Sequence, residues 1–400
     1  MVSLADLQPT HASFMYLERY VNAGSPSGFS FQNTPGPGFR ACDAGDCFNL
    51  PIFDCASFSA VHVGDVPTLA AAELPVHPEM ADNFASLVGQ GPARHLPAAA
   101  TSSGRTLAVV DRGIPFYAKV AYQRLLGRIT RRMTRAHVVS AIEVSRCYEG
   151  AIAAGRMPQS FYMYREHSGL HFPDETGLKD WGYVERDIAP YPRGTFIEVP
   201  AFSLLPIPSD GSRPLLADLL DRTAALRTSE GFFDLVIRPL VDLYFSSVIV
   251  LGLQPEAHAQ NVVCLLNDVY VPVGFALRDM ESVDKDVPLL ERCGLLSTFT
   301  PTGYKFLFKD AYNYQVMHSF MYDFKFGEYL LGPLVDTWGA YDGRLNVSEI
   351  EERTKTYVRE QLALLPDDFF PAGVWYDYDA IVHEGAPTRQ YREHPHPRFR

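Results

Sequence analysis

The sequence predicts an α+β protein whose two parts, residues 1–195 and 196–400, differ in their balance of strand and helix. Apolar or alternating runs separated by turn residues dominate the first part, as β-strands require. Apolar residues at helical spacing dominate the second part. A chain of 400 residues that is 47% hydrophobic and 20% charged can bury the cores of both parts.

In the first part, turn residues separate the expected elements. The triplet Asp111-Arg112-Gly113 lies between the apolar runs 106–110 and 114–122, which predicts a β-hairpin. Residues 135–155 carry apolar side chains at helical spacing and are expected to form a helix. Residues 159–165 and 183–188 are typical of strands, and a polar loop is expected between them.

The second part is expected to be rich in helix. We predict helices over 215–228, over 231–251 with a bend near Pro239, and over 348–364, where Ser348 and Glu351 have the spacing of a capping box. Strand-like runs occur at 261–266, 269–277 and 304–309. The most hydrophobic window, 240–253, is shorter than the ~20 residues of a membrane helix and is interpreted as a buried helix.

Charge, cysteine content and the N-terminus narrow the class of protein. The net charge of −12 argues against a general nucleic-acid binder, and an anionic substrate would need a local basic pocket. Six cysteines without a C-x-x-C pair are too sparse for a disulfide scaffold, so reduced thiols are expected. The N-terminus lacks the features of a signal peptide, so a cytoplasmic protein without a membrane partner is expected.

Hydroxyl, glycine and guanidinium groups come together at Ser102-Ser103-Gly104-Arg105-Thr106. Lys119 and Arg131 follow 14 and 26 residues after Arg105. Arginine offers a planar fork of donors, and small residues let the backbone approach closely, so this turn suits phosphate oxygens. The alternative is a solvated turn with ordinary surface cations.

Oxygen ligands for a hard metal ion come together in a second constellation. Glu256 and Asn261 precede a predicted hairpin, which would carry Asp279 back toward Asn261. Two carboxylates and an amide oxygen suit Mg²⁺, and His258 between them could move a proton or stabilise an oxyanion. The alternative is a helix end with satisfied polar side chains.

Two further histidine segments leave a structural and a functional interpretation open. His77 stands between Pro75 and Pro78, whose rigidity could position it, although a lone histidine is more often structural. The polar segment 165–175 contains His167, His171 and Asp174, which a metal-dependent oxygenase could use. A polar loop is the preferred interpretation of this segment.

The order of these constellations resembles that of the IucA/IucC-type family, the siderophore synthetases that work independently of nonribosomal peptide synthetases. Members carry a P-V-H-P-W-like segment, S-x-R-T, a lysine, a later arginine, E-x-H-x-Q-N and R-D. The matching residues are Pro75-Val76-His77-Pro78, Ser103-Gly104-Arg105-Thr106, Lys119, Arg131, Glu256-Ala257-His258-Ala259-Gln260-Asn261 and Arg278-Asp279. The resemblance covers residues 70–280.

The resemblance implies a fingers-and-palm α+β fold and an ATP- and Mg²⁺-dependent, AMP-forming ligase of siderophore or related biosynthesis. Such an enzyme adenylates a carboxylic acid, often citrate-like, and condenses it with an amine or alcohol. The residues implied are Ser103, Arg105, Thr106, Lys119, Gln260 and Asn261 for ATP; Arg131 and His258 for the reacting carboxylate; and Glu256, Asn261 and Asp279 for the metal. The apolar helices of the second part are compatible with a homodimer.

The chain also departs from the family pattern. It is shorter than typical members and is expected to lack most of their N-terminal lobe. Their upstream G-H-P-x-H-P motif is matched only by residues 24–28, without the histidines, and Glu79 stands where a tryptophan is expected. The alternative function is therefore a catalytically silent homologue that binds a carboxylate, a nucleotide or a partner enzyme.

Overall fold

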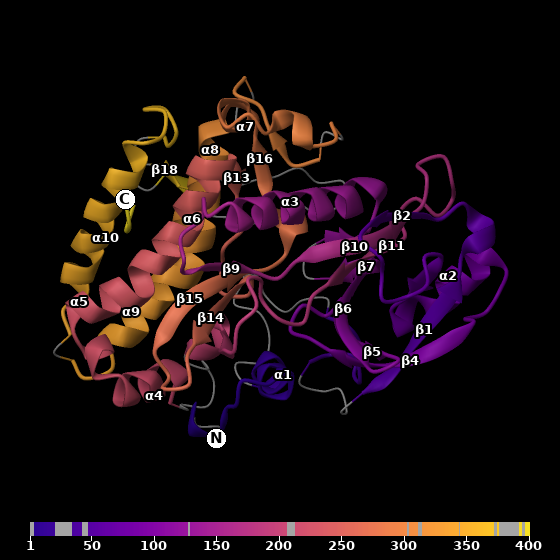
Figure 1. The fold of residues 1–400 in the computed structure, drawn as a ribbon, viewed down its shortest axis with the longest axis horizontal. Coiled ribbons are helices and arrows are strands. Elements are labelled where there is room, and N and C mark those ends of the chain that lie inside the picture. The colour runs from indigo at the N-terminus through magenta and orange to yellow at the C-terminus, as the bar shows by residue number, and fades with distance from the viewer. Residues whose placement is uncertain are drawn as a thin grey trace.

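The two largest sheets of the described chain face a common centre in the computed structural model (Figure 1). The structure describes residues 4–20, 34–41, 47–126, 129–205, 213–301, 304–310, 314–343, 345–371, 374–375, 392–393 and 397–400. The mixed helix-and-strand architecture predicted from the sequence is confirmed.

An eight-stranded sheet forms the first part, and every neighbouring pair of its strands is antiparallel. Its order is β2 (Val61–Gly64), β10 (Glu166–His171), β11 (Gly182–Arg186), β6 (Ile114–Val120), β5 (Thr106–Asp111), β4 (Arg94–Ala100), β1 (Phe48–Asp54) and β3 (Glu73–Pro75). The predicted hairpin is confirmed as β5 and β6, where Arg112 and Gly113 both take positive φ angles, as a tight two-residue turn requires.

The polar loop expected within residues 165–175 is wrong for most of its length, because residues 166–171 form strand β10. Buried polar side chains of this strand have hydrogen-bond partners on neighbouring strands. For example, Glu166 Oε1 accepts a bond from Arg186 Nη2 at 2.6 Å. Gly169 has no Cβ, which would lie 2.6 Å from Tyr183 O. Polar residues therefore occupy a central strand because cross-strand partners satisfy them.

Helix α3 (Arg135–Ala153) connects the two parts, and it crosses above the centre of the molecule in Figure 1. Its first half packs Val138 and Ile142 into the core of the eight-stranded sheet. Its second half packs Val144 and Tyr148 into the core of the second part. The two cores share this helix, and a domain boundary near residue 195 stays a prediction.

A four-stranded sheet covered by helices forms the second part. Its order is β12 (Ile197–Pro200), β14 (Val262–Leu266), β15 (Pro272–Leu277) and β9 (Phe161–Met163), and β9 runs parallel to β15. A smaller sheet contains β13 (Leu253–Gln254), β16 (Asp284–Asp286) and β17 (Phe306–Leu307). The helices of this part include α4 (Leu215–Arg222), α6 (Arg238–Leu251), α9 (Gly332–Gly339) and α10 (Val347–Leu362).

The described fold contains further helices and strands. They are α1 (His11–Tyr20), α2 (Ala81–Val88), α5 (Ser229–Phe232), α7 (Val287–Arg292), α8 (Tyr314–Ser319), β7 (Tyr122–Leu126), β8 (Ile129–Arg131), β18 (Val374–Trp375) and β19 (Arg392–Glu393). Wide π-helical turns precede α6 at Phe233–Ile237 and α9 at Phe320–Leu331. We expected a bend near Pro239, and the first of these π-helical turns ends just before it, at Ile237. Pro239 lies in the first turn of α6, where proline is favoured because it has no N–H that needs a partner.

Two predicted helix ends are wrong. The helix expected over 215–228 ends at Arg222 and is followed by a separate 3-10 turn, Ala224–Arg227. The predicted capping box does not form: Asn346 caps α10 by accepting a bond from Glu349 N at 3.3 Å. Glu351 instead pairs with Arg398 Nε at 2.7 Å, because residues 397–400 pack against this helix.

Most of residues 240–253 are buried, as expected, and five described cysteines carry free thiols: Cys47, Cys55, Cys147, Cys264 and Cys293. No helix among the described residues is long and apolar enough to cross a bilayer.

Shortening a core side chain of α3 should destabilise the fold. Ile142 is 1% exposed, so Ile142→Ala is expected to lower the free energy of unfolding by about 2–5 kcal/mol, through lost burial and a residual cavity. Leu87 of α2 is 56% exposed, so Leu87→Ala should change it by less than about 0.5 kcal/mol. Urea unfolding measures both, and equal effects would contradict this placement of α3.

Candidate active site

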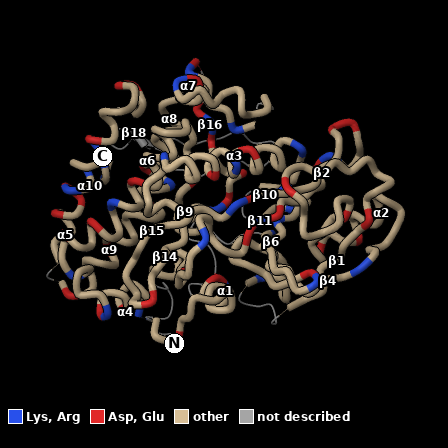
Figure 2. Tube along the Cα trace, viewed as in Figure 1, with Lys and Arg blue, Asp and Glu red and all other residues tan. Residues whose placement is uncertain are grey.

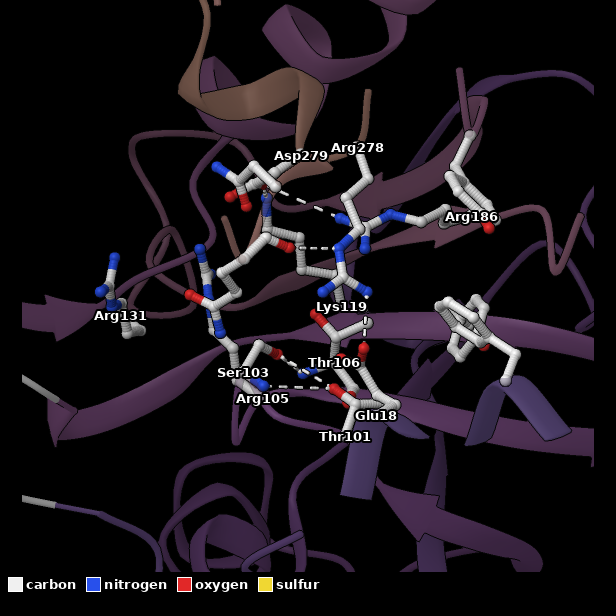
Figure 3. Close-up of a pocket in the computed structure, with 15 residues that line it drawn as sticks. Glu18, Thr101, Ser103, Arg105, Thr106, Lys119, Arg131, Arg186, Arg278 and Asp279 are labelled. Carbon is white, nitrogen blue, oxygen red and sulfur yellow. Dashed lines mark hydrogen bonds and ion pairs between the residues drawn. The ribbon is translucent and has the colours of Figure 1, made fainter. Parts of the chain in front are cut away.

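A polar cavity of about 90 Å³ lies between the eight-stranded sheet and the β14–β15 hairpin (Figure 3). It brings together eight of the ten residues that the sequence singled out: Ser103, Arg105, Thr106, Lys119, Arg131, Gln260, Asn261 and Asp279. The other lining residues are Phe14, Glu18, Thr101, Tyr117, Tyr164, Arg186 and Arg278. Segments more than 150 residues apart in the chain therefore build one site.

The cavity is basic in an acidic protein. Its lining contains five cations, Arg105, Lys119, Arg131, Arg186 and Arg278, against two carboxylates, Glu18 and Asp279. The whole chain has a net charge of −12, and Figure 2 shows acidic residues spread along the chain, away from this centre as well as near it. The cavity therefore provides the local positive charge that an anionic ligand requires.

The turn between β4 and β5 is shaped by its own hydroxyl groups. Ser103 Oγ accepts a bond from Thr106 N at 2.9 Å, and Thr101 Oγ1 donates to Thr106 O at 2.6 Å. Gly104 takes a φ of +72°, and a Cβ there would lie 3.1 Å from Pro35, so only glycine fits the turn easily. The turn presents Arg105 to the cavity, and its buried Nη1 donor has no partner among the described residues.

Glu281, which the sequence did not single out, is the centre of the charge network. Its Oε2 lies 2.8 Å from Lys119 Nζ and 3.0 Å from Arg105 Nη2. Its Oε1 lies 3.7 Å from His137 Nε2 and accepts a bond from Tyr304 Oη at 3.2 Å. Burial alone would raise the pKa of Glu281, but Lys119 and Arg105 hold it well below the usual value. Its position two residues after Asp279 was the available signal.

Asp279 is carried to the cavity by the β14–β15 hairpin, as predicted. Arg278 N donates to Asn261 O at 2.9 Å, which closes the hairpin beside Asn261. Asp279 takes a left-handed φ of 74°, which turns the chain toward the first sheet, where the carboxylate pairs with Lys119. Burial lowers the pKa of Lys119, but Asp279, Glu166 and Glu281 together raise it above its usual value, so the lysine is charged.

Arg131 differs from the other cations in the lining. It lies at the end of β8, and in Figure 3 it stands apart from the network of dashed bonds. It has no ion-pair partner among the residues that the structure describes, and burial together with the neighbouring Arg105 lowers its pKa. An unpaired guanidinium at the wall of a cavity is a ready partner for a carboxylate or phosphate.

His258 and Glu256, the remaining two predicted residues, do not line the cavity. Burial lowers the pKa of His258 to about 4, and its Nδ1 accepts a bond from Gln260 N at 3.2 Å. Glu256 Oε1 lies 2.6 Å from Lys325 Nζ; burial raises its pKa, but Lys325 and His258 lower it to about 2. Neighbouring charges shift the pKa of both residues, but neither side chain lines the cavity.

The donor set for a metal ion is therefore only partly assembled. Asn261 and Asp279 share the cavity, while Glu256 is engaged by Lys325. No group of three or more acidic, histidine or cysteine side chains suited to a metal occurs within the described ranges. This also removes support for the oxygenase alternative: His167 lies beside Asp187 at 3.6 Å, while His171 Nδ1 faces Phe172 O.

Helix α1 contributes two residues that the motifs did not indicate. Glu18 is 1% exposed; its carboxylate accepts bonds from Ser102 Oγ at 2.5 Å and from Arg278 Nη1 at 3.1 Å. Phe14 stacks on Tyr164, with ring centroids 6.1 Å apart. His77, by contrast, is fully buried away from the cavity lining with its pKa lowered to about 3 by burial, in agreement with a structural role.

The fold of this chain is that of the siderophore synthetases that work independently of nonribosomal peptide synthetases, which confirms the resemblance drawn from the motifs. The ATP-bound aerobactin synthetase IucA of a hypervirulent Klebsiella pneumoniae pathotype superimposes with a TM-score of 0.69 and 15% identity, over 90% of this chain and 72% of that one. The petrobactin biosynthesis protein AsbB of Bacillus anthracis str. Sterne gives 0.64 and 16%, over 88% and 69%.

Aerobactin synthetase IucC from the same Klebsiella pathotype gives a TM-score of 0.57 and 15% identity, over 80% of this chain and 65% of that one. A family model described as ferric iron reductase FhuF-like transporter matches residues 229–321. No curated protein matches the sequence. At these identities the structural neighbours establish the fold alone, and the activity must be argued from the cavity.

Neutralising Glu281 should destabilise the protein in a pH-dependent way. Glu281→Gln leaves Lys119 and Arg105 without their shared carboxylate, and the expected loss at pH 7 is about 3–5 kcal/mol of unfolding free energy. Because the folded-state pKa is depressed, the stabilisation is fully present above the unfolded value of about 4.3 and is lost as the pH falls below it.

Urea unfolding at pH 7 and at acid pH measures the difference between the wild type and Glu281→Gln. Glu352→Gln is the control, since Glu352 lies 65% exposed on α10 and should show no measurable change. A difference for Glu281→Gln that does not shrink toward acid pH would contradict the depressed pKa.

Proposed function

We propose that this protein is an ATP-dependent ligase that activates a carboxylic acid by AMP transfer and condenses it with a nucleophile in siderophore or related biosynthesis. The observation that carries the proposal is the gathering of Ser103, Arg105, Lys119 and Arg131 with Gln260, Asn261 and Asp279 in one basic cavity. The solved structure of the similar IucA contains ATP, which supports nucleotide use by a chain with the same fold.

The turn at Ser103–Thr106 and Lys119 would hold the phosphates. Arg105 offers a buried donor without a protein partner, which a phosphate oxygen could accept. Lys119 is charged and buried, so it would contribute a strong field at short range once a ligand excludes water. Its present partners, Asp279 and Glu281, hold it in position at the centre of the cavity.

Asp279 and the Asn261 side chain suit a Mg²⁺ ion that takes further ligands from phosphate oxygens and water. Such an ion would neutralise negative charge where two anions must meet. Glu256 could join the donor set only if it exchanged Lys325 for the ion, since the two are 2.6 Å apart. The assignment of Glu256, Asn261 and Asp279 to the metal therefore stays a prediction.

Arg131 would bind the carboxylate that is activated. Attack of a carboxylate on a phosphate brings like charges together, and an unpaired guanidinium on the cavity wall would offset this repulsion. His258 is neutral at pH 7 with a pKa near 4 and lies outside the lining, so it would act by accepting the bond from Gln260 N and holding Gln260 at the cavity wall. The acid itself stays a proposal: a citrate-like polycarboxylate fits the excess of cations.

Hydroxylamine trapping tests the proposed reaction. With ATP and Mg²⁺ across a panel of mono-, di- and tricarboxylates, one acid is expected to give hydroxamate together with AMP. ADP in place of AMP would replace acyl adenylation with acyl phosphate formation. No turnover with any acid, and no thermal shift with ATP, would favour a catalytically silent homologue that binds a carboxylate, a nucleotide or a partner enzyme.

Arg131→Ala and His258→Ala are expected to reduce hydroxamate formation by far more than tenfold while the melting temperature stays close to that of the wild type. Arg132→Ala is the matched control for the first, because Arg132 is 46% exposed and pairs with Asp180 at 3.6 Å outside the cavity. A loss below tenfold, about 1.4 kcal/mol of barrier, would remove the substituted residue from the reaction.

A further inference from the structure

The face of the four-stranded sheet that looks toward the cavity carries mostly apolar side chains and one carboxylate. Val263 and Leu265 of β14 and Ala276 of β15 form a small cluster on this face. Glu198 of β12 lies directly beside Leu265 in the strand register. Burial raises the pKa of Glu198 to about 7, although Tyr164 and Arg193 act in the opposite direction. A carboxyl group with such a pKa is ready to exchange a proton at neutral pH.

Tyr164 connects Glu198 to the cavity. Its hydroxyl donates a hydrogen bond to Glu198 Oε2, and its side chain is part of the cavity lining. Burial and the neighbouring Glu198 raise the pKa of Tyr164 well above its usual value, so it is a neutral phenol that can accept one proton while it passes on its own. No part of the proposed activation step uses this pair.

The cavity has two ends of different polarity. At the α1 end, Arg278 pairs with Glu18 at 3.1 Å and Arg186 pairs with Glu166 at 2.6 Å, so both cations are compensated. Arg131, at the opposite end, has no such partner among the described residues. The anionic substrates should therefore occupy the Arg131 end. A cationic substrate would meet less repulsion at the α1 end than at the Arg131 end.

Aromatic rings line this compensated end. Phe14, Tyr117 and Tyr164 all contribute to the lining and belong to one cluster. Aromatic faces attract ammonium groups, whereas they offer little to the hydroxyl of a neutral alcohol. His258, the histidine considered for proton transfer, has a pKa near 4 and lies outside the lining, so it is a poor proton acceptor at pH 7.

We propose that the nucleophile is an amine, which binds at the α1 end of the cavity, and that Tyr164 and Glu198 accept its proton. The inference rests on the proposed ligase function and names its second substrate class. Tyr164 would touch the amine, while Glu198 would act through Tyr164.

An ammonium nucleophile loses two protons on its way to the amide. The ammonium gives one proton to Tyr164 Oη, which passes its own proton to Glu198. The free amine nitrogen attacks the activated carbonyl carbon, and the bond from that carbon to its phosphate leaving group breaks, with the electron pair leaving on the phosphate oxygen. The second nitrogen proton goes to solvent, and an amide remains.

The groups that surround Glu198 bear on its titration. Tyr164 and Arg193 lower the pKa of Glu198, and the charges of Glu18 and Glu198 help to raise the pKa of Tyr117 of β6, which burial raises most. From α1, His11 contributes a ring nitrogen 2.9 Å from Tyr117 Oη. On this face β14 presents Val263 and Leu265, which do not titrate.

Glu198→Gln and Tyr164→Phe test the inference against two nucleophiles. An alkylamine is charged at pH 7 and must lose a proton before it attacks, whereas hydroxylamine is already neutral. The condensation rate with the alkylamine is expected to fall about 100-fold in both variants, with hydroxylamine trapping retained. The ratio of the wild-type rate to the Glu198→Gln rate with the alkylamine should rise with pH through about 7 as Glu198 deprotonates, because the increase in free amine is common to both proteins.

Asp242→Asn is the matched control. Burial raises the pKa of the Asp242 carboxyl group, as it does for Glu198. Asp242 also accepts a hydrogen bond from a tyrosine, Tyr357 Oη at 2.5 Å. It lies on α6, outside the cavity lining. It should leave both nucleophile reactions unchanged. Equal losses with the two nucleophiles in Glu198→Gln, or no loss with either, would overturn the inference.

A failure of the proposed function is recognised separately. If the wild type forms no hydroxamate, that function fails, and the inference is then judged by infrared titration of the carboxyl band that Glu198→Gln removes. A midpoint near pH 7 supports the proton-accepting pair. A midpoint near the usual value of about 4.3 overturns it.

Discussion

The shared carboxylate of Glu281 is the interaction on which the site depends. It joins Lys119 and Arg105, which belong to the eight-stranded sheet, to the turn that follows β15 of the other sheet. Buried charges of one sign would repel one another and separate these elements, and an unpaired buried cation costs several kcal/mol. One carboxylate between two cations and His137 therefore fixes the distance between the two halves of the cavity.

Carboxylates neutralise the arginines at one end of the cavity but not at the other, so the two ends suit different ligands. Glu18 and Glu166 neutralise the arginines at the α1 end, while Arg131 keeps its charge at the other end. A uniformly basic cavity would attract anions everywhere and repel an ammonium nucleophile. The arrangement instead separates a cationic region at Arg131 from an aromatic one, and these two regions suit the acid and the amine of the proposed condensation.

The motifs predicted most of the cavity lining because each contains residues close in sequence whose chemistry is shared. The hairpins β5–β6 and β14–β15 were also predictable, since turn residues separate apolar runs. Strand β10 was missed because Glu166 and Ser168 look solvent-exposed until their partners are known. Asn346 was missed as the cap of α10 because Ser348 and Glu351 offered the same local pattern two residues later.

The sequence alone determined the class of fold, the order of the site segments and the residue types that we propose for binding a phosphate and a carboxylate. Local patterns suffice for these because hydrogen bonding in turns and apolar periodicity act over a few residues. Only the tertiary structure decided that Glu18 and Glu281 join the charge network and that Glu198 bonds to Tyr164 of the lining. It also placed His258 and Glu256 outside the lining and left Arg131 without an ion-pair partner among the described residues. Burial and the charges of distant segments set a side chain's pKa and its freedom to bind, and neither is a property of neighbouring residues in the chain.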